Sequence, residues 1–504
     1  MQGSNHSDAA ALAMLEGLKS KRITADLIVN AVISGIEDGT LKTGAKFVST
    51  REIADHLGIS RTTVMKAFES LIARGYLSVR HGSGAWLTSP HGPVAGNKNL
   101  SSSNQGSSAF DWSRLTSQLA RNLDLQAAEH IMQADFDEIN FGSVSPEHLP
   151  IAAWRKGLAN LEKTLQSIDF SANQEVFGYR PLRQAIADYL GRSGKLQCTA
   201  DQVVIGSGVQ NVIGQALQLL IKSGDRVICE NPGFWGARDK ITSLGGEPIP
   251  VGIDNEGLKV SDLDQIQNQM QEHAQWIYVA PSYQEPTGVV LSQTRKQQLI
   301  EWANANNTAI FEDDWDSEFQ YLGSTTSSLF SQDQTGSVIY FSSFWRLLYP
   351  LSSVSFLVLP ADSKLQEVFK SYKTIWERQF TLLEHLVLTE ILNGGHLETK
   401  MRATWKLYRK QRQALIFALK KSFGNDIEIS QSNTGGHVVV RAKSDTLANL
   451  LAANNGGGSP LVFQSTAAYY FADRVKNEYM VPFTHLDADK TEALVAELAA
   501  RLQG

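Results

Sequence analysis

The feature that most constrains the fold is a change of composition between residues 88 and 110, which read TSPHGPVAGNKNLSSSNQGSSAF. Ser, Asn, Gly and Pro dominate this stretch and apolar residues are scarce, which is typical of a flexible linker. A structureless loop of this length inside one compact domain is uncommon. A chain of 504 residues is also too long for one ordinary core. We therefore predict two folded parts, one of about 87 residues before the linker and one of close to 400 residues after it.

The composition of the whole chain excludes several functional classes. Its 42% hydrophobic and 19% charged residues are typical of a globular protein. No apolar run reaches the roughly 18 residues needed to span a bilayer, and the N-terminus lacks the pattern of a secretory signal. Cys198 and Cys229 cannot form a disulfide framework and do not have the spacing of a metal site. We therefore expect a cytoplasmic protein without a membrane partner or a bound metal.

The charge of the first part differs from that of the whole chain. The net charge is −6, which alone argues against nucleic acid as a partner. Between Lys42 and Trp86, however, seven basic side chains stand against three acidic ones, a local charge of +4. Local charge governs attraction to phosphates, so this segment is a candidate nucleic-acid interface.

Two helices are predicted at the start of this first part. Apolar residues over 23–36 follow helical spacing until Gly39 ends the run. Ser49 and Glu52 stand three residues apart in a capping-box arrangement. This arrangement predicts a second, short helix that Gly58 closes.

A third helix and a hairpin are predicted next. In SRTTVMKAFESLIARGYL one apolar stripe contains Val64, Phe68, Leu71 and Ile72. The residues YLSVRHGSGAWL then alternate like a strand, turn at the Gly-Ser-Gly of residues 82–84, and return as a second strand. Three helices followed by a two-stranded hairpin describe a winged helix-turn-helix, whose last helix lies in the major groove of DNA.

The N-terminal end of the third helix is the candidate base-reading surface. Arg61 can read guanine through two parallel hydrogen bonds, and the hydroxyls beside it can serve bases or phosphates. A basic helix face is usually only solvated, so the order and spacing of the elements carry this interpretation. The candidate DNA-binding residues are Ser49, Thr50, Arg51, Ser60, Arg61, Thr62, Thr63, Lys66, Arg80, His81 and Gly82.

The segment LKTGAKFVSTREIADHLGISRTTVMKAFESLIARGYLSVRHGSGAWL, residues 41–87, resembles the GntR family of bacterial regulators over its whole length. Val48 is one departure, at a position where the family often has proline. The resemblance implies a winged helix-turn-helix DNA-binding domain over residues 23–88, after an N-terminal extension over residues 1–22. It also implies double-stranded operator DNA as a partner.

The second part alternates strands and helices from about residue 135 to the end. Five segments each present an apolar strand that ends in polar or turn residues: DQVVIGSGVQ, DRVICENPGFW, QWIYVAPSYQEPTG, NTAIFEDDWDSEF and SVIYFSSFW. In an α/β sheet the ligand site lies at the carboxyl ends of the strands. We therefore expect the residues that follow these strands to converge on one pocket.

These segments resemble the fold-type I aminotransferases, and specifically the aminotransferase-like domain of MocR regulators. The resemblance runs from about Asp137 to the C-terminus and rests on GSGVQ, ENPGFWGAR, APSYQEPTG and EDDWDSEFQY. MocR regulators join such a domain through a linker to a GntR-type DNA-binding domain. The resemblance implies a linker over residues 89–110 and a large α/β fold-type I aminotransferase-like domain over residues 111–504. It also implies a head-to-tail homodimer that binds pyridoxal 5′-phosphate and responds to a small-molecule effector.

Part of the family's cofactor pocket is retained in the sequence. Residues 207–210 match the turn that cradles the cofactor phosphate, at a helix N-terminus where backbone N–H groups favour an anion. Phe234 matches the ring that stacks on the cofactor, and Asp313 matches the carboxylate that pairs with the pyridine nitrogen. The retained positions are Ser207, Gly208, Val209, Gln210, Phe234 and Asp313.

Four other positions differ from the family pattern. Trp315 stands where members carry a tyrosine that reaches the cofactor's phenolic oxygen, and Glu285 takes a position that is often neutral. The segment FWRLLYPLSS aligns with a pattern close to Phe-Ser-Lys-Thr-Leu-Phe-Pro, which puts Arg346 at the lysine and Ser353 at the phosphate-binding arginine. Arginine keeps its charge in proteins and cannot form a Schiff base. We therefore expect no covalent pyridoxal phosphate, no catalytic residue and no transaminase activity.

Two roles for Arg346 stay open at this point. Its planar guanidinium suits the phosphate or carboxylate of a ligand. It could instead form an ion pair with Glu285 or Asp313.

The sequence favours a DNA-binding transcriptional regulator whose aminotransferase-like domain dimerises and senses a small-molecule effector. Three alternatives stay open. One is a regulator that holds pyridoxal phosphate without a covalent bond, through residues 207–210 and Asp313. Another is a regulator whose large domain is only a dimer scaffold, with the old pocket filled by Trp315, Trp345 and Arg346. The last is an active aminotransferase, which the missing lysine disfavours.

Overall fold

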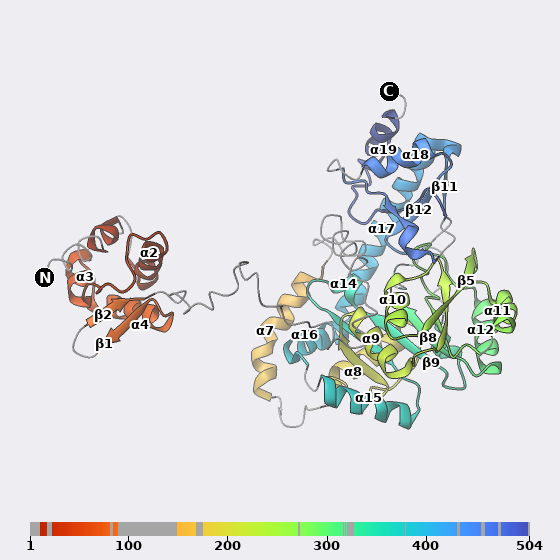
Figure 1. Cartoon of the computed structure of the whole chain (residues 1–504), viewed down its shortest axis with the longest axis horizontal. Coiled ribbons are helices and arrows are strands. Elements are labelled where there is room, and N and C mark those ends of the chain that lie inside the picture. The colour runs from red at the N-terminus through yellow and green to blue at the C-terminus, as the bar shows by residue number, and fades with distance from the viewer. Residues whose placement is uncertain are drawn as a thin grey trace, which may run out of the picture. The chain divides into compact units, whose positions relative to one another are not determined.

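The computed structural model describes residues 11–17, 23–80, 84–88, 149–167, 175–270, 273–315, 317, 319, 327–377, 380–430, 434–454, 459–471 and 475–501. The chain divides into two compact units, Met1–Asp111 and Trp112–Gly504, and Figure 1 draws both. The predicted linker, residues 89–110, lies outside the described residues and stays a prediction.

The N-terminal unit has the predicted order of three helices and a hairpin. Helices α2 (Ala25–Glu37), α3 (Thr50–Leu57) and α4 (Arg61–Ala73) are followed by strands β1 (Leu77–Arg80) and β2 (Gly84–Leu87). The two strands pair antiparallel in the register that sets Arg80 opposite Gly84. The hairpin tip, residues 81–83, lies outside the described residues.

Local sequence sets the ends of α3 and the start of α4. Ser49 Oγ accepts a hydrogen bond from the Glu52 backbone N–H, and Glu52 Oε2 accepts one from the Ser49 backbone N–H, so the predicted capping box is present. Gly58 closes α3 with a φ of +66°, a conformation that glycine adopts at low cost. Ser60 caps α4 by accepting from the Thr63 backbone N–H at 3.2 Å.

One residue of the predicted apolar stripe in α4 does not face the core. Ile72 is 40% exposed, and Ala67 is buried together with Val64, Phe68 and Leu71. Spacings of three and four residues from Val64 reach Ala67, Phe68 and Leu71, whereas Ile72 lies at the border of that face. The prediction that Ile72 belongs to the buried stripe was therefore wrong.

Two further segments complete the core of this unit. Residues 11–16, within the predicted N-terminal extension, are helical, and Ala11 and Leu15 are buried in the same hydrophobic cluster as Val64. The Phe47 backbone N–H donates to the Ala85 carbonyl at 2.8 Å, so the chain before α3 runs beside β2. The predicted boundary at residues 22–23 therefore excludes from the domain a helical segment that contributes to its core.

An eight-stranded sheet lies at the centre of the second unit, as far as the described residues show. Its strand order is β3-β10-β9-β8-β7-β4-β5-β6, with β4, β5, β7, β8 and β9 parallel and β10 antiparallel to β3 and β9. The bounds are β3 (Val203–Ser207), β4 (Arg226–Asn231), β5 (Glu247–Asp254), β6 (Gly257–Leu258), β7 (Trp276–Val279), β8 (Ala309–Asp314), β9 (Val338–Ser343) and β10 (Val354–Val358). The carboxyl ends of the parallel strands therefore meet at one edge.

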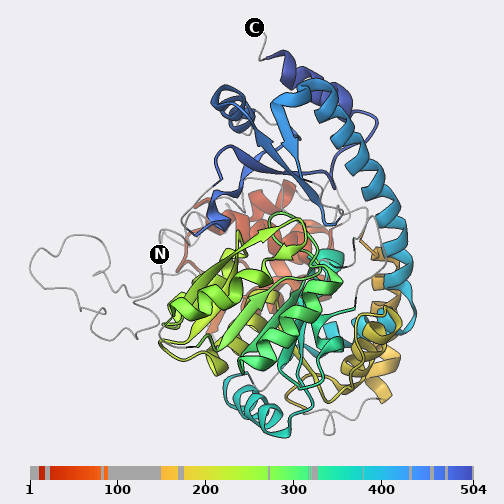
Figure 2. The same ribbon diagram turned by 90° about the vertical axis from the view of Figure 1, so that its right-hand side faces the viewer.

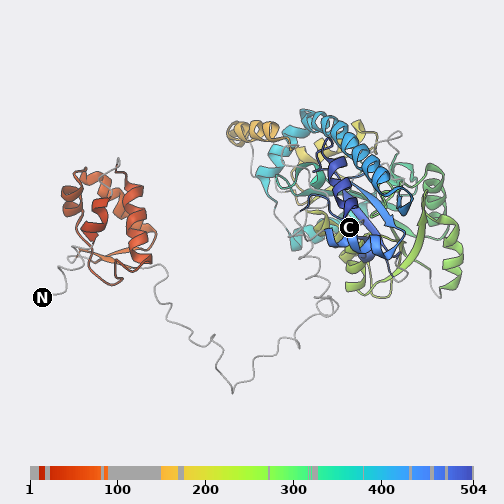
Figure 3. The same ribbon diagram turned by 90° about the horizontal axis from the view of Figure 1, so that it is seen from above.

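Helices cover both faces of this sheet. Successive residues of β8 illustrate the alternation, because Ile310 packs in one apolar cluster and Phe311 packs in another on the opposite face. The helices are α7 (Ile151–Ser167), α8 (Arg180–Arg192), α9 (Val209–Leu220), α10 (Trp235–Ser243), α11 (Leu263–Gln269), α12 (Gln293–Ala305), α13 (Leu329–Gln332), α14 (Trp345–Leu348), α15 (Ser363–Trp376) and α16 (Leu382–Asn393). Figure 3 shows α7 at the edge of the unit, where it packs on α16.

A smaller antiparallel sheet lies at the C-terminal end of this unit. Its strand order is β11-β12-β14-β13, and the long helix α17 (His396–Phe423) extends from the large sheet toward it, as Figure 2 shows. The remaining elements are β11 (Ile427–Ile429), β12 (His437–Ala442), α18 (Asp445–Ala453), β13 (Gln464–Ser465), η7 (Thr466–Tyr469), β14 (Glu478–Pro482) and α19 (Thr491–Ala500). No helix among the described residues is long and apolar enough to cross a membrane.

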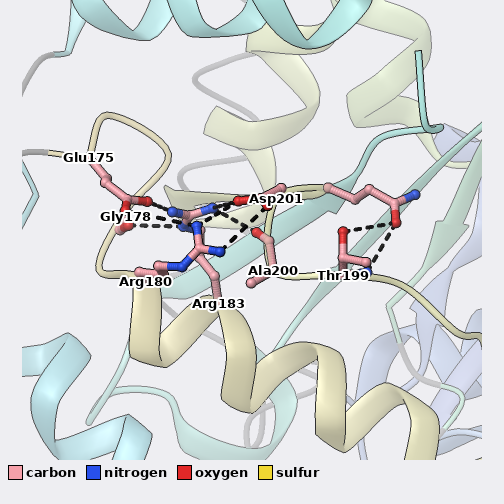
Figure 4. Close-up of polar contacts among 8 residues, drawn as sticks. Glu175, Gly178, Arg180, Arg183, Thr199, Ala200 and Asp201 are labelled. Carbon is pink, nitrogen blue, oxygen red and sulfur yellow. Dashed lines mark hydrogen bonds and ion pairs between the residues drawn. The ribbon is translucent and has the colours of Figure 1, made fainter. Parts of the chain in front are cut away.

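A buried arginine ties the start of α8 to the strand that leads into the candidate site. Arg183 is only 2% exposed; it pairs with Glu175 and donates to the carbonyls of Gly178 and Ala200 (Figure 4). The Phe177 carbonyl, in the segment before α8, also accepts a hydrogen bond from the Ile205 backbone N–H at 2.9 Å. These bonds fix the position of β3 and hence of the turn between β3 and α9.

Candidate functional site

The exposed start of α4 is the candidate DNA-reading surface. Arg61, Thr62 and Lys66 are exposed on this helix, while Thr63 is half-buried. The Thr63 hydroxyl lies 2.9 Å from Ser60 Oγ, so these two hydroxyls bond to each other as well as capping the helix. Arg61, Thr62 and Lys66 are thus the predicted DNA-binding side chains of α4 that are exposed to solvent.

The other candidate DNA-binding residues lie on α3 and the hairpin. Ser49 is engaged in the capping box, Thr50 is half-buried at the start of α3, and Arg51 is exposed with a 4.0 Å ion pair to Asp55. Arg80 is the last residue of β1. His81 and Gly82 lie outside the described residues, so their proposed contacts stay predictions.

The carboxyl edge of the large sheet brings several predicted pocket residues together. Val209, Asp313 and Trp315 border one small cavity together with Val212, Ile213, Phe341 and Ser342. We call this cavity, with the adjoining side chains of Glu285 and Arg346, the sheet-edge pocket. The cavity has a volume of about 10 Å³, room for roughly one water molecule.

Asp313 is the buried carboxyl group of the sheet-edge pocket. It is 3% exposed, and its Oδ2 accepts a hydrogen bond from the Tyr278 hydroxyl. Its Oδ1 is buried and has no hydrogen-bond partner among the residues that the structure describes. Burial raises the pKa of Asp313 to about 7, against the opposing effect of the Tyr278 hydrogen bond.

Arg346 lies against Trp315 in the same pocket. Arg346 belongs to the short helix α14, is 3% exposed, and holds its guanidinium carbon 5.0 Å from the centre of the Trp315 ring. A methyl group on Gly436 would lie 2.6 Å from Nη1 of Arg346, so the guanidinium occupies space that only glycine leaves open. The Trp315 ring also meets the edge of Tyr283 at 5.0 Å.

Glu285 connects the large sheet to the smaller C-terminal sheet. Its Oε1 accepts a hydrogen bond from the Tyr469 hydroxyl at 3.0 Å. Burial raises the pKa of Glu285 to about 7; the Tyr469 bond and the charge of Arg346 oppose the rise, and Asp313 adds to it. Arg346 therefore acts electrostatically on Glu285 while it stacks on Trp315, and its predicted role toward a ligand anion stays a prediction.

The turn between β3 and α9 carries an acidic partner that the sequence did not suggest. Gly208, with a φ of +82°, donates its backbone N–H to the Ser353 carbonyl at 2.7 Å, and the Ser207 and Ser353 hydroxyls lie 3.5 Å apart. The Ser353 N–H and the Ser352 hydroxyl both donate to Glu384 Oε1 at 2.7 Å. None of these residues borders the small cavity that Asp313 and Trp315 line.

Phe234 borders a second small cavity, and Gln210 lies near Phe234. Phe234 borders it together with Glu230 and Tyr278, and a methyl group on Gly236 would collide with both Phe234 and Gln210. Gln210 accepts a hydrogen bond from the ammonium group of Lys240. Phe234 thus borders the second cavity, whereas Asp313 borders the first; Tyr278 stands between them.

Sequence reasoning missed four residues that contact the predicted site residues or border the cavities beside them: Tyr278, Glu230, Tyr469 and Glu384. Tyr278 and Glu230 lie on strands whose apolar pattern was recognised, and the polar residues within those strands were the available signal. Tyr469 contacts Glu285 from 184 residues away and Glu384 contacts Ser353 from 31 residues away, and no local pattern marks either residue.

Two family models match the chain in separate places. The model described as "Bacterial regulatory proteins, gntR family" matches residues 24–87. The model described as "Aminotransferase class I and II" matches residues 137–344, and this match ends two residues before Arg346.

Curated relatives align with most of the chain. The uncharacterized HTH-type transcriptional regulator YdeL of Bacillus subtilis is 29% identical over 407 residues, 80% of each chain. The probable rhizopine catabolism regulatory protein MocR of Rhizobium meliloti is 26% identical and covers 80% of this chain and 78% of its own length. The pyridoxine biosynthesis transcriptional regulator PdxR of Corynebacterium glutamicum is 25% identical over 471 residues, 92% of each chain.

Solved structures resemble the large unit. The kynurenine aminotransferase of Pyrococcus horikoshii has a TM-score of 0.67 and 21% identity, and the match covers 78% of this chain and 98% of that one. A multiple substrate aminotransferase from Thermococcus profundus has a TM-score of 0.66 and 20% identity over similar shares. At these identities the likeness shows the fold, which is the predicted fold-type I architecture.

The two units therefore define a class of protein in which a GntR-type helix-turn-helix domain for DNA binding is joined to an aminotransferase class I and II domain. Within that class the chain is similar to curated relatives that are named as HTH-type transcriptional regulators or as the regulatory protein MocR. The recognition made from the sequence is confirmed at this level.

Proposed function

We propose that the protein is a transcriptional regulator that binds operator DNA as a homodimer and senses a small-molecule effector without transaminase chemistry. A head-to-tail dimer of the large unit would place two reading heads on repeated half-sites. The exposed Arg61 and Lys66 at the start of α4 support the DNA-reading role. The site of action that this role requires is the cytoplasm, where bacterial DNA lies.

The absence of transaminase chemistry rests on Arg346. A Schiff base needs a primary amine that can lose its proton, and a guanidinium keeps its charge. Arg346 is buried in α14, the short helix after β9, and packs on Trp315. No lysine borders either small cavity in the part of the chain that the structure describes.

Pyridoxal phosphate is the cofactor of aminotransferase-fold relatives, and the residues of this chain fit it only in part. The unpartnered Oδ1 of Asp313 suits a protonated ring nitrogen, which favours the alternative of non-covalent binding. Against it stand Arg346 at the lysine position, the Glu384 carboxylate beside Ser353, and a cavity of about 10 Å³. A covalently held cofactor does not fit these residues.

The small cavity favours a second candidate function for the large unit. A pyridine ring needs far more space than one water molecule, so a pocket filled by Trp315 and Arg346 would leave the unit as a dimer scaffold. The two candidates share the DNA-binding role and differ in whether a ligand moves these side chains.

The DNA-binding role is tested by selecting bound fragments from random duplex DNA with the full-length protein. We expect enrichment of one motif in two copies, because a dimer carries two reading heads. Recovery of unselected sequences, with an affinity that depends on salt alone, would contradict a sequence-specific regulator.

A further inference from the structure

The outer face of α4 carries one apolar side chain among its predicted DNA-binding residues. Met65 is 48% exposed and lies outside the hydrophobic cluster that contains Val64 and Phe68. We propose that Met65 contacts the C5-methyl group of a thymine in the major groove and so helps to select the operator sequence. This inference rests on the proposed DNA-binding function, because it names a base that the same surface recognises.

The position of Met65 in α4 supplies the first argument. Met65 follows Arg61 by four residues and Thr62 by three, and side chains at these spacings are neighbours on one helical face. A helical side chain also leans toward the N-terminus of its helix. The Met65 side chain therefore belongs to the same surface as the exposed Arg61 and Thr62, at the end of a recognition helix that contacts base edges.

The polar side chains of this face supply the second argument. Arg61 and Lys66 are hydrogen-bond donors, which suit guanine, and Glu69 is an acceptor, which suits cytosine. Adenine is read best by Asn or Gln, and α4 contains neither. An A·T pair also presents the thymine methyl group in the major groove, where apolar side chains recognise it. Met65 is the exposed hydrophobic side chain in the first two turns of α4 that can make this contact.

The chemistry of methionine supplies the third argument. Its side chain is unbranched and polarizable, so it adapts to the position of an apolar partner and gains dispersion contacts there. It has no hydrogen-bond donor and only a weak acceptor, so it cannot satisfy the amino groups that adenine and cytosine present in the groove. Met65 would therefore favour thymine by contact and disfavour these two bases by desolvating their amino groups.

Two other exposed apolar side chains show why position matters. Single exposed apolar residues are common on protein surfaces, so exposure alone indicates no function. In the described part of the N-terminal unit, Ile72 and Val79 are also large, apolar and exposed. Ile72 lies near the C-terminal end of α4, and Val79 lies in β1. Met65 differs from both because it lies beside the predicted base-reading residue Arg61.

The test replaces thymidine by deoxyuridine in the duplex that the full-length protein selects from random DNA. Deoxyuridine pairs as thymidine does but lacks the C5-methyl group. We expect the substitution at one thymine of each half-site to weaken binding by about fourfold for one half-site and roughly 15-fold for both, which is the effect of losing one buried methyl group at each. Gel-shift titration measures both affinities. A selected motif in which no thymine shows this effect would overturn the inference.

Variants assign the effect to one side chain. Met65→Ala should bind the thymidine and deoxyuridine duplexes with affinities within about twofold of each other, whereas Met65→Leu should keep the preference for thymidine, because it keeps an apolar contact. Thr62→Ser removes the other methyl group of this surface, keeps the hydroxyl, and should also keep the preference. Ile72→Ala, an exposed apolar site on the same helix, is the matched control and should leave both affinities within about twofold of wild type. A preference that survives Met65→Ala, or one that Thr62→Ser removes, would refute the role of Met65.

Failure of this inference can be told apart from failure of the proposed function. Enrichment of one motif whose thymines all tolerate deoxyuridine would refute the methyl contact and leave the regulator standing. Enrichment of no motif by the folded wild-type protein would refute the sequence-specific regulator itself. The unfolding temperature of each variant is measured as well, and we expect Met65→Ala to leave it unchanged because the residue is exposed.

Discussion

The reading head and the sheet-edge pocket use their polar residues in opposite ways. In the reading head the hydroxyls of Ser49 and Ser60 complete helix ends, and basic side chains such as Arg61 face solvent. In the pocket the carboxyl groups of Glu285 and Asp313 are withdrawn from solvent with raised pKa values. The head matches a family pattern along its length because caps and core fix its sequence. The pocket residues Glu285, Trp315 and Arg346 differ from the family pattern that the sequence resembles.

The largest expected effect is a loss of stability in the large unit, with the stability of the N-terminal unit unchanged. Arg183→Ala removes a buried guanidinium that pairs with Glu175 and binds two carbonyls. We expect a loss of about 3 kcal/mol in the free energy of unfolding of the large unit, since the remaining partners lose their cation and packing. Calorimetric unfolding should show this transition shifted and that of the N-terminal unit unchanged.

Arg180→Ala is the matched control for that variant. Arg183 lies 3.8 Å from the Asp201 carboxylate, and Arg180 binds the same carboxylate at 2.7 Å but is itself half-exposed. An exposed ion pair contributes about 1 kcal/mol or less. Equal losses from the two variants would mean that burial of Arg183 does not determine its contribution.

The next effect concerns the head alone. Arg61→Ala removes the exposed guanidinium at the start of α4, and we expect specific DNA binding to weaken by roughly 10- to 100-fold for each reading head, in line with about 1–3 kcal/mol per base contact. Gel-shift titration against the selected motif measures it. Arg74→Ala, at the other end of α4, should retain most of the affinity. An unchanged affinity for Arg61→Ala would remove the base-reading role.

Ser49 separates helix capping from DNA contact. Ser49→Ala should destabilise the N-terminal unit by about 1 kcal/mol because α3 loses its capping box. Ser49→Asp should restore that stability, since aspartate caps a helix well, while its charge weakens binding to DNA phosphates. A Ser49→Asp protein with both wild-type stability and wild-type DNA affinity would show that Ser49 only caps the helix.

The smallest effect is a pH dependence of the large unit. Glu285 loses its proton near pH 4.5 when unfolded and near pH 7 when folded. The folded state therefore binds more protons between these values, and the free energy of unfolding falls as pH rises through this window. Glu285→Gln removes that contribution, so its stability relative to wild type should increase from pH 5 to pH 7. A constant difference would contradict the raised pKa.

Local signals in the sequence predicted most of the secondary structure that positions both sites. The capping box at Ser49, the glycine after α3, and the strand–turn–helix of residues 203–220 depend on neighbours within a few residues. Burial at the edge of a helical face was not predictable in this way. Ile72 has the right spacing for a stripe but lies at its border, where packing from other elements decides exposure.

The pocket could be predicted only as far as its strand ends. The positions of Asp313 and Trp315 follow from β8, and the structure places both at one cavity. Glu384 and Tyr469 come from α16 and η7, so their contacts depend on how distant segments pack. A resemblance could locate the replaced lysine, but it could not show the acidic group beside Ser353.

The most direct test of the central claim is mass spectrometry of the full-length protein after incubation with pyridoxal 5′-phosphate and borohydride reduction. Reduction traps any lysine joined to the cofactor, and peptide mapping shows which lysine it is. We expect no stoichiometric adduct, because Arg346 stands at the end of β9 and no lysine borders the described cavities. A single adduct at full occupancy on one lysine, such as Lys240, would contradict the account and return the chain to cofactor chemistry.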